Sequence, residues 1–239
     1  MKYKAAVLVP ILSLSLISSA AVLDNDINNV HAAVIDNVHD TLHITSQQRQ
    51  QINDDFINWL AAHADNKFAV SGYYFDHART DNHQVWYAPT IDGDILVKNA
   101  THQHVNYKIK AIGGVVIYTA KDGTTGKCDD IAKDTANGKS YSSQQIDTSK
   151  PVDKYLLADN GIVYKCKLTG TTAAPDSGFA IKGHNNHHVA KWTILTDKNV
   201  QKEYRHLIKK DTGNDIKTTI DYDRITDGQP DYGVINEAQ

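Results

Sequence analysis

The stretch Tyr155-Leu156-Leu157-Ala158-Asp159-Asn160-Gly161-Ile162-Val163-Tyr164 decides what kind of sheet this chain builds. Two short apolar runs flank the polar residues Asp159-Asn160-Gly161. A tight turn between strands needs a residue with positive φ, and glycine adopts that conformation without strain. The pattern therefore predicts a β-hairpin, in which two antiparallel strands follow each other directly.

A second hairpin signal lies earlier in the chain, where Asp92-Gly93 separates Trp86-Tyr87 from residues 95–97. Further β-branched and aromatic runs predict strands at 68–75, 107–118, 179–182 and 192–195. Within residues 107–118, Gly113-Gly114 indicates a bulge or a close backbone approach. Together these signals predict a mostly antiparallel sheet built from hairpins.

Two helices are predicted, one on each side of this strand-rich region. Thr45 and Gln48 form a capping-box pair at the start of the first. Its apolar stripe consists of Ile52, Phe56, Trp59, Leu60 and His63. The second runs from Asp197, a plausible N-cap, to Lys210, and Gly213 follows it. Its apolar face consists of Val200, Tyr204, Leu207 and Ile208. The expected fold class is α+β: N-terminal helix, hairpin-built sheet, C-terminal helix.

The first residues are typical of a signal peptide. Lys2 and Lys4 precede an apolar stretch, 5–17, that is too short for a stable membrane span. Small-residue cleavage sites end at Ala20, Ala21 or Ala32, and we favour cleavage after Ala32; the alternative is an uncleaved anchor. The expected organisation is a signal peptide at 1–32, a flexible segment at 33–44 and one α+β domain at 45–239 with a loosely ordered C-terminal tail. The mature protein is then secreted or loosely associated with the cell surface, with no membrane partner.

The net charge bears on the possible binding partners, and the cysteine content bears on disulfide formation. The net charge is −3 and dense Lys/Arg blocks are lacking, which argues against nucleic-acid binding. Cys128 and Cys166 are the only two cysteines. An even pair in an exported protein favours a disulfide between them; the alternative is two independent buried thiols.

Catalytic motifs are not evident. The sequence lacks Gly-x-Ser-x-Gly, and the carboxylates that follow Cys128 would raise the pKa of its thiol. Histidines cluster at His102 and His104, and again at His184, His187 and His188. They could ligate a metal such as zinc, but loop histidines flanked by Asn and Lys are commonly just solvated. We therefore expect no catalytic residue, cofactor or metal site.

Aromatic residues give the remaining clue. Twelve tyrosines against four phenylalanines favour side chains with one end in water. Four aromatic residues lie on neighbouring predicted strands and form the candidate binding surface: Tyr73, Tyr74, Trp86 and Tyr87. Such a surface could stack on sugars or grip a peptide. The alternative is a sheet whose tyrosines pack under a helix with their hydroxyls at the rim.

Several segments also resemble an uncharacterised exported domain family of lactobacilli. The resemblance rests on residues 69–71, 74–77, 86–88, 92–95, 111–118 and 155–164, and it spans roughly residues 45–210. It implies a domain that is released or associated with a Gram-positive cell envelope, and it implies no activity. We expect a non-catalytic binding or interaction module for wall polymer, glycan or peptide. The alternative is a secreted cell-wall or peptide hydrolase, assisted by a metal bound to the histidines.

Overall fold

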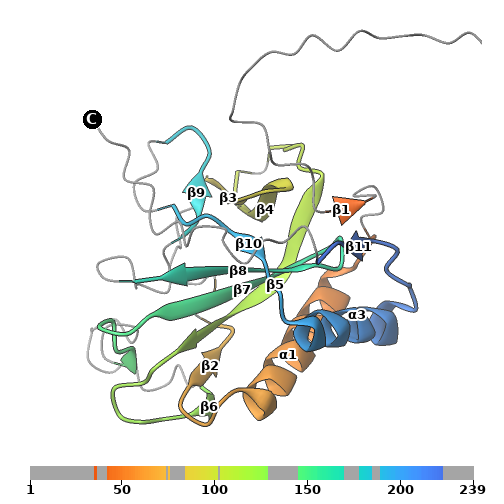
Figure 1. Cartoon of the computed structure of the whole chain (residues 1–239). Helices are drawn as coiled ribbons and strands as arrows, with labels where there is room; N and C mark the ends of the chain where they lie inside the picture. Colours follow the sequence, from red (N-terminus) through yellow and green to blue (C-terminus); the bar gives the residue numbers. More distant parts are fainter. Residues whose placement is uncertain are drawn as a thin grey trace, which may run out of the picture. The chain divides into compact units, whose positions relative to one another are not determined.

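The computed structural model describes residues 35–36, 42–73, 75, 84–101, 103–128, 145–169, 178–184 and 189–222. It confirms the α+β class: two helices and a mostly antiparallel sheet of many strands make up this part of the chain (Figure 1). The described helices and strands all belong to one compact unit, which begins at Ala33. Neither described helix has the length and apolar character needed to cross a membrane.

Helix α1 (Ser46–His63) begins as the sequence predicts. Thr45 is its N-cap, and the Thr45 Oγ1 atom accepts a hydrogen bond from the Gln48 amide at 3.2 Å, while Gln48 Oε1 accepts from the Thr45 amide at 3.0 Å. The buried face differs in part from the predicted stripe. It consists of Ile52, Phe56, Ile57 and Leu60. Trp59 is only half-buried, and its ring stacks on exposed His63 with centroids 4.6 Å apart.

Helix α3 (Lys198–Thr212) also matches its prediction. The Asp197 carboxylate accepts hydrogen bonds from the amides of Asn199 and Val200, and Gly213 ends the helix with φ 75°. All four residues of its predicted apolar face are buried. The two helices lie side by side on one face of the sheet (Figure 1), and the ring of Phe56 meets Tyr204 edge-on at 5.9 Å.

The main sheet contains nine strands of the described chain. They are β2 (Ala69–Ser71), β3 (Val85–Thr90), β4 (Gly93–Asn99), β5 (Ile109–Tyr118), β6 (Gly126–Lys127), β7 (Val152–Ala158), β8 (Val163–Leu168), β9 (Ala180–Ile181) and β10 (Thr193–Ile194). The path runs β10-β8-β7-β5-β4-β3-β9, and β2, which carries β6, also pairs with β5. A parallel bridge between Thr90 and Trp192 joins the end of β3 to the segment before β10. The sheet path therefore curls back on itself.

Both predicted hairpins are present. Strands β7 and β8 pair antiparallel from Val152↔Leu168 to Leu157↔Val163, and β3 and β4 pair antiparallel across Asp92-Gly93. The register shifts between Ala111 and Gly113 of β5, which marks the predicted bulge. Gly113 and Gly114 also permit close approach: a Cβ atom on Gly113 would overlap Asn53 of α1, and one on Gly114 would overlap Phe75.

Two hydrophobic clusters lie on the two faces of this sheet. One joins α1 and α3 to outward-facing residues of β5, β7 and β8, such as Val115, Leu157 and Val163. The other fills the inside of the curl, where Trp86, Leu156 and Trp192 are at most 2% exposed. Alternation along each strand thus divides apolar residues between the helix-covered face and the enclosed face.

The segment predicted to be flexible, 33–44, is fixed in part. Strand β1 (Ile35–Asp36) pairs antiparallel with β11 (Thr219–Ile220) in a separate two-stranded sheet. The Leu42 amide donates to the Asp159 carbonyl at 3.3 Å, and Ile44 is buried. The predicted signal peptide, its cleavage point after Ala32 and residues 223–239 of the tail lie outside the described residues.

The predicted disulfide is not formed. Cys128 and Cys166 are both buried, and no S–S bond joins them. The Cys128 amide donates to the Val70 carbonyl of β2, whereas Cys166 lies on β8, and β5 and β7 lie between those two strands in the sheet. Burial raises the pKa of the Cys166 thiol to about 12.

Candidate functional site

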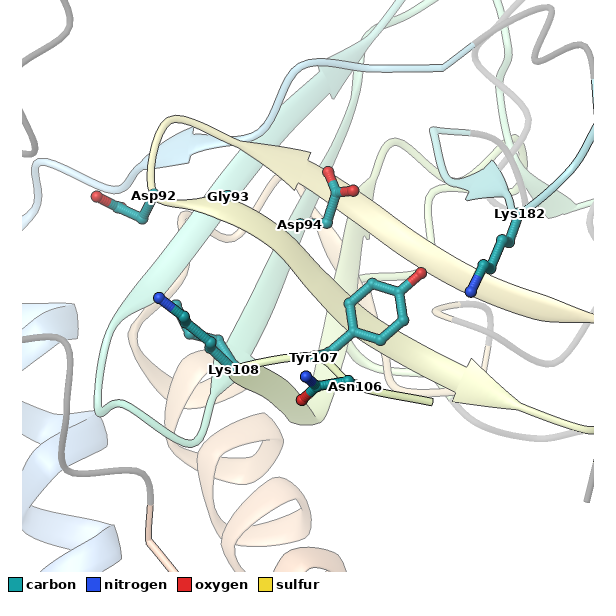
Figure 2. A pocket seen from close by; sticks show the side chains of 8 residues that line it. Asp92, Gly93, Asp94, Asn106, Tyr107, Lys108 and Lys182 are labelled. Carbon is teal, nitrogen blue, oxygen red and sulfur yellow. The ribbon is translucent and has the colours of Figure 1, made fainter. Parts of the chain in front are cut away.

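An open cleft of about 350 Å³ lies beside the β3–β4 hairpin (Figure 2). Its walls come from the hairpin turn, from the segment that leads into β5 and from the residue after β9. The lining residues are Asp92, Gly93, Asp94, Asn106, Tyr107, Lys108, Ile109 and Lys182. Its volume lies in the range of about 300–1,000 Å³ that is typical of small-ligand sites.

Local sequence chemistry shapes one wall. The Thr90 hydroxyl accepts a hydrogen bond from the Asp92 amide at 3.1 Å and donates to the Gly93 carbonyl at 2.6 Å. Gly93 has φ 102°, a conformation that residues with a Cβ rarely adopt. These features fix the backbone of the turn, on which Asp92 and Asp94 line the cleft.

Pairing between distant segments supplies the other walls. Strands β4 and β5 run parallel with Ile95 opposite Ile109, which brings Tyr107 and Lys108 beside the hairpin. Strand β9 pairs with the opposite edge of β3, and the Lys182 amide donates to the Val85 carbonyl at 2.9 Å. In Figure 2, Lys182 reaches from its strand toward Tyr107, whereas Lys108 lies on the side of the hairpin turn.

Tyr107 and Asp94 line the cleft, and Tyr87 packs against Tyr107. The rings of Tyr87 and Tyr107 lie 6.1 Å apart and are tilted by 37°. Burial, and then the negative charge of Asp94, raise the pKa of both tyrosines. Burial also raises the pKa of Asp94 itself. In the part of the chain that the structure describes, the Asp94 carboxylate makes no hydrogen bond or ion pair, so it is available to a ligand.

Asp92 links the cleft to the protein interior. Its Oδ2 atom accepts a hydrogen bond from the buried Tyr164 hydroxyl at 3.1 Å, and the Asn160 amide donates to that hydroxyl at 3.0 Å. The other carboxyl oxygen, Oδ1, is buried and has no hydrogen-bond partner among the described residues. Burial raises the pKa of Asp92 to about 6, although the bond from Tyr164 acts in the opposite direction.

A second buried carboxyl fixes the start of β5. Asp159 is 2% exposed, and its Oδ1 atom accepts from the Lys110 amide at 2.9 Å. The Asp159 amide donates to the Lys110 carbonyl at the same distance. Burial raises the pKa of Asp159 to about 6, against the lowering effects of the Lys110 amide bond and of Arg49. Asp159 thereby anchors the chain just beyond the cleft residues Lys108 and Ile109.

The predicted aromatic surface is wrong in one essential respect. Trp86 is 2% exposed and packs in the enclosed core, with its ring 6.5 Å from Phe179. Tyr87 points to the opposite face and joins Tyr107 beside the cleft. Tyr73 packs partly buried against the core, and Tyr74 lies outside the described residues. Neighbouring residues on a strand face opposite sides of the sheet, so Trp86 and Tyr87 do not share a surface.

Of the two histidine clusters, the structure describes only His104 and His184, and both are exposed. His102, His187 and His188 lie outside the described residues. Within the described ranges, no three His, Cys, Asp or Glu side chains come together as a metal site.

A buried lysine on β7 is a feature that the sequence analysis missed. Lys154 is fully buried, and its ammonium group donates to the Phe75 carbonyl at 3.1 Å. The same group lies 3.9 Å from the ring centroid of Phe179, whose ring stacks on Trp192. Aromatic faces and a carbonyl offset part of the cost of burying this charge. Lys154 occupies a position on β7 where the alternating residues Val152 and Leu156 are apolar and buried. A lysine at a core position of this pattern is the sequence signal that could have identified it.

Comparisons with known proteins do not assign this site. The chain matches no protein-family model, no curated protein and no solved structure.

Proposed function

We propose that this protein is an exported, non-catalytic binding module, and that it binds a glycan in the cleft beside the β3–β4 hairpin. The observation that carries the proposal is the open arrangement of Tyr107, backed by Tyr87, with Asp94 and Asn106 beside it. Export rests on the signal-peptide pattern of residues 1–32.

The chemistry of the cleft suits a sugar. A sugar ring has apolar C–H faces, which stack on a tyrosine ring, and a rim of hydroxyl groups, which need hydrogen-bond partners. Tyr107 offers the ring, while Asp94 and Asn106 offer an acceptor-only carboxylate and an amide that both donates and accepts. Few apolar residues line the cleft, which favours a polar ligand over a lipid or an apolar peptide side chain.

Binding can be tested with a matched pair of tyrosine variants. Tyr107→Ala removes the proposed stacking surface, whereas Tyr222→Ala removes a half-buried tyrosine that contacts Lys198 of α3 and does not line the cleft. We expect Tyr107→Ala to weaken binding to purified wall sacculi by at least about tenfold, or ~1.4 kcal/mol, in co-sedimentation. Tyr222→Ala should bind like the wild type.

Equal binding by the wild type and Tyr107→Ala, with both proteins folded by circular dichroism, would remove the cleft as the binding site. Absence of binding to sacculi by any variant would direct the test to other purified glycans. A glycan array that shows no binding would then contradict the proposal.

A secreted glycan hydrolase is the second candidate, and one observation favours it. Glycoside hydrolases use two carboxyl groups, one of which has a raised pKa and acts as general acid. Asp92 and Asp94 line the same cleft, and the pKa of Asp92 is raised to about 6. Sugar fragments released from sacculi by the wild type, and lost in Asp92→Asn, would establish hydrolysis; sedimentation without fragments supports the binding module.

A further inference from the structure

Among the residues that the structure describes, four charged side chains line the cleft, two of each sign. Asp92 and Asp94 are the carboxylates, and Lys108 and Lys182 are the ammonium groups. Neither lysine forms an ion pair with any part of the chain that the structure describes. When all four are ionised their charges cancel, so the loss of one negative charge leaves this set of side chains with a net positive charge.

We propose that the cleft selects glycans that carry carboxylate groups, and that it binds them more tightly in mild acid than at neutral pH because Asp92 becomes neutral. The inference rests on the proposed glycan-binding function and adds the ligand class and its regulation.

The Tyr164 hydroxyl of β8 donates a hydrogen bond to the Oδ2 atom of Asp92. Lys108, which precedes β5, and Asp94 of β4 line the same cleft. Behind Tyr164, on the turn after β7, lies Asp159, whose charge also acts on Tyr164 and which in turn faces Arg49 of α1 and Lys110 of β5. The charges of Asp159 and Tyr164 also act on Tyr204 of α3, and both raise its pKa.

Geometry makes the charge of Asp92 easy to remove. Its Oδ1 atom is buried and receives no hydrogen bond from the described residues, so one of the two oxygens of the ionised carboxylate is not stabilised by a donor. Consistent with this, burial raises the pKa of Asp92 to about 6. The pKa of Asp94 is also raised by burial. Acidification therefore removes negative charge from the cleft, while the lysines keep their positive charge.

The two lysines are placed to meet an anionic sugar. Figure 2 shows Lys108 and Lys182 on opposite sides of Tyr107, and the Lys182 ammonium group points toward the tyrosine. A sugar stacked on Tyr107 could direct a carboxylate to either side and meet an ammonium group. Sugar carboxylates resemble α-carboxyl groups with pKa values of about 3–4, so they stay ionised in the range where Asp92 is protonated.

The experiment compares two hexasaccharides by isothermal titration calorimetry near pH 5 and near pH 7.5, on either side of the pKa of Asp92. One probe alternates N-acetylglucosamine with glucuronic acid, and the other contains only N-acetylglucosamine. We expect the acidic probe to bind about tenfold more tightly near pH 5 than near pH 7.5. The neutral probe should bind more weakly than the acidic probe near pH 5 and show no such change.

Four variants identify the residues responsible for the pH-dependent binding of the acidic probe. Asp92→Asn imitates the protonated carboxyl and should bind the acidic probe tightly at both pH values. Lys182→Gln should lose about tenfold in affinity near pH 5. The matched controls are Asp54→Asn on the exposed face of α1 and Lys167→Gln on the exposed side of β8, and both should behave as the wild type.

Different outcomes overturn different claims. If both probes bind equally and without pH dependence, the inference fails while the glycan-binding function stands. If Asp92→Asn keeps the wild-type pH profile, Asp92 is not the responsible group. Equal binding of inorganic polyphosphate would show that the cleft accepts any polyanion, which overturns the choice of carboxylate glycans. If no glycan binds the folded protein at either pH, the proposed function fails together with the inference.

Discussion

The two predicted hairpin turns of this protein contain nearly the same residue types but lie in different surroundings. Asp159-Asn160-Gly161 joins β7 to β8, and Asp92-Gly93 joins β3 to β4. Each contains a glycine with positive φ, and each contains an aspartate whose pKa is raised to about 6. The first turn is packed inside the protein, whereas the second forms the wall of an open cleft.

Tertiary contacts cause the difference. Gly161 lies against Ile216, and Asp159 is bonded to both backbone groups of Lys110, one of them through its side chain. A Cβ on Gly93 would have no atom of any described residue within 4 Å, apart from Gly93 and its two chain neighbours, and within the same part of the chain one oxygen of Asp92 has no hydrogen-bond partner. A turn motif thus specifies the local backbone, while the segments that pack around it decide whether its aspartate is enclosed in the protein or lines an open cleft.

The largest expected effect comes from substituting the two glycines. Gly161→Ala places a Cβ 2.6 Å from Ile216 at φ 77°, so strain and overpacking add to about 3 kcal/mol of lost stability. Gly93→Ala meets no neighbour and should lose only about 1 kcal/mol, from backbone strain alone. Urea unfolding of the two variants measures the difference. Equal losses would contradict the distinction between a packed and an open turn.

The next effect is a fall in stability with rising pH. The folded pKa values of about 6 for Asp92 and Asp159 lie above the unfolded value of about 3.9, so the folded protein holds these protons more tightly. Their contribution is fully present below about pH 4 and is lost as the pH rises through about 6. With Asp92 partly screened by solvent, we expect a loss of about 2 kcal/mol in total between pH 4.5 and 7.5.

Urea midpoints across this range test the expectation. Hydrogen bonds from neighbouring side chains lower the pKa values of Asp122 and Asp147. These two groups therefore change protonation below this pH range and do not hide the expected fall in stability. A stability that rises or stays level from pH 4.5 to 7.5 would contradict the account of both buried carboxyls.

The smallest expected effect compares the two aspartates directly, near pH 5. Asp159→Ala leaves the Lys110 amide without its side-chain acceptor and should cost about 2 kcal/mol. Asp92→Ala removes one acceptor from Tyr164 but also a carboxyl oxygen that has no donor, so it should cost about 1 kcal/mol. A larger loss for Asp92→Ala than for Asp159→Ala would reverse the roles assigned to the two turns.

Local signals predicted most of the fold. The capping box of Thr45 and Gln48, the Asp197 N-cap and both glycine turns act within a few residues, so the sequence alone reveals them. The bulge in β5 was also predictable, because glycine inside a strand has few other uses. The disulfide was wrong because the spacing of Cys128 and Cys166 along the chain does not reveal how many strands separate them.

The cleft could be predicted only in part. Tyr87 was named from the sequence, but its neighbour Trp86 was placed on the same surface, although strand alternation puts the two on opposite faces. Tyr107 and Lys108 reach the site through the parallel pairing of β4 with β5, and Lys182 reaches it through β9. Such pairings join segments that are distant in the sequence, so local sequence patterns do not predict them.

The most direct test of the central claim, that the cleft is the ligand site, is an NMR titration of the isotopically labelled protein near pH 5 with the hexasaccharide of glucuronic acid and N-acetylglucosamine. We expect amide shift changes at Asp94, Tyr107, Lys108 and Lys182, with little change along the exposed face of α1. Shift changes confined to residues away from the cleft, or none at saturating sugar, would contradict it.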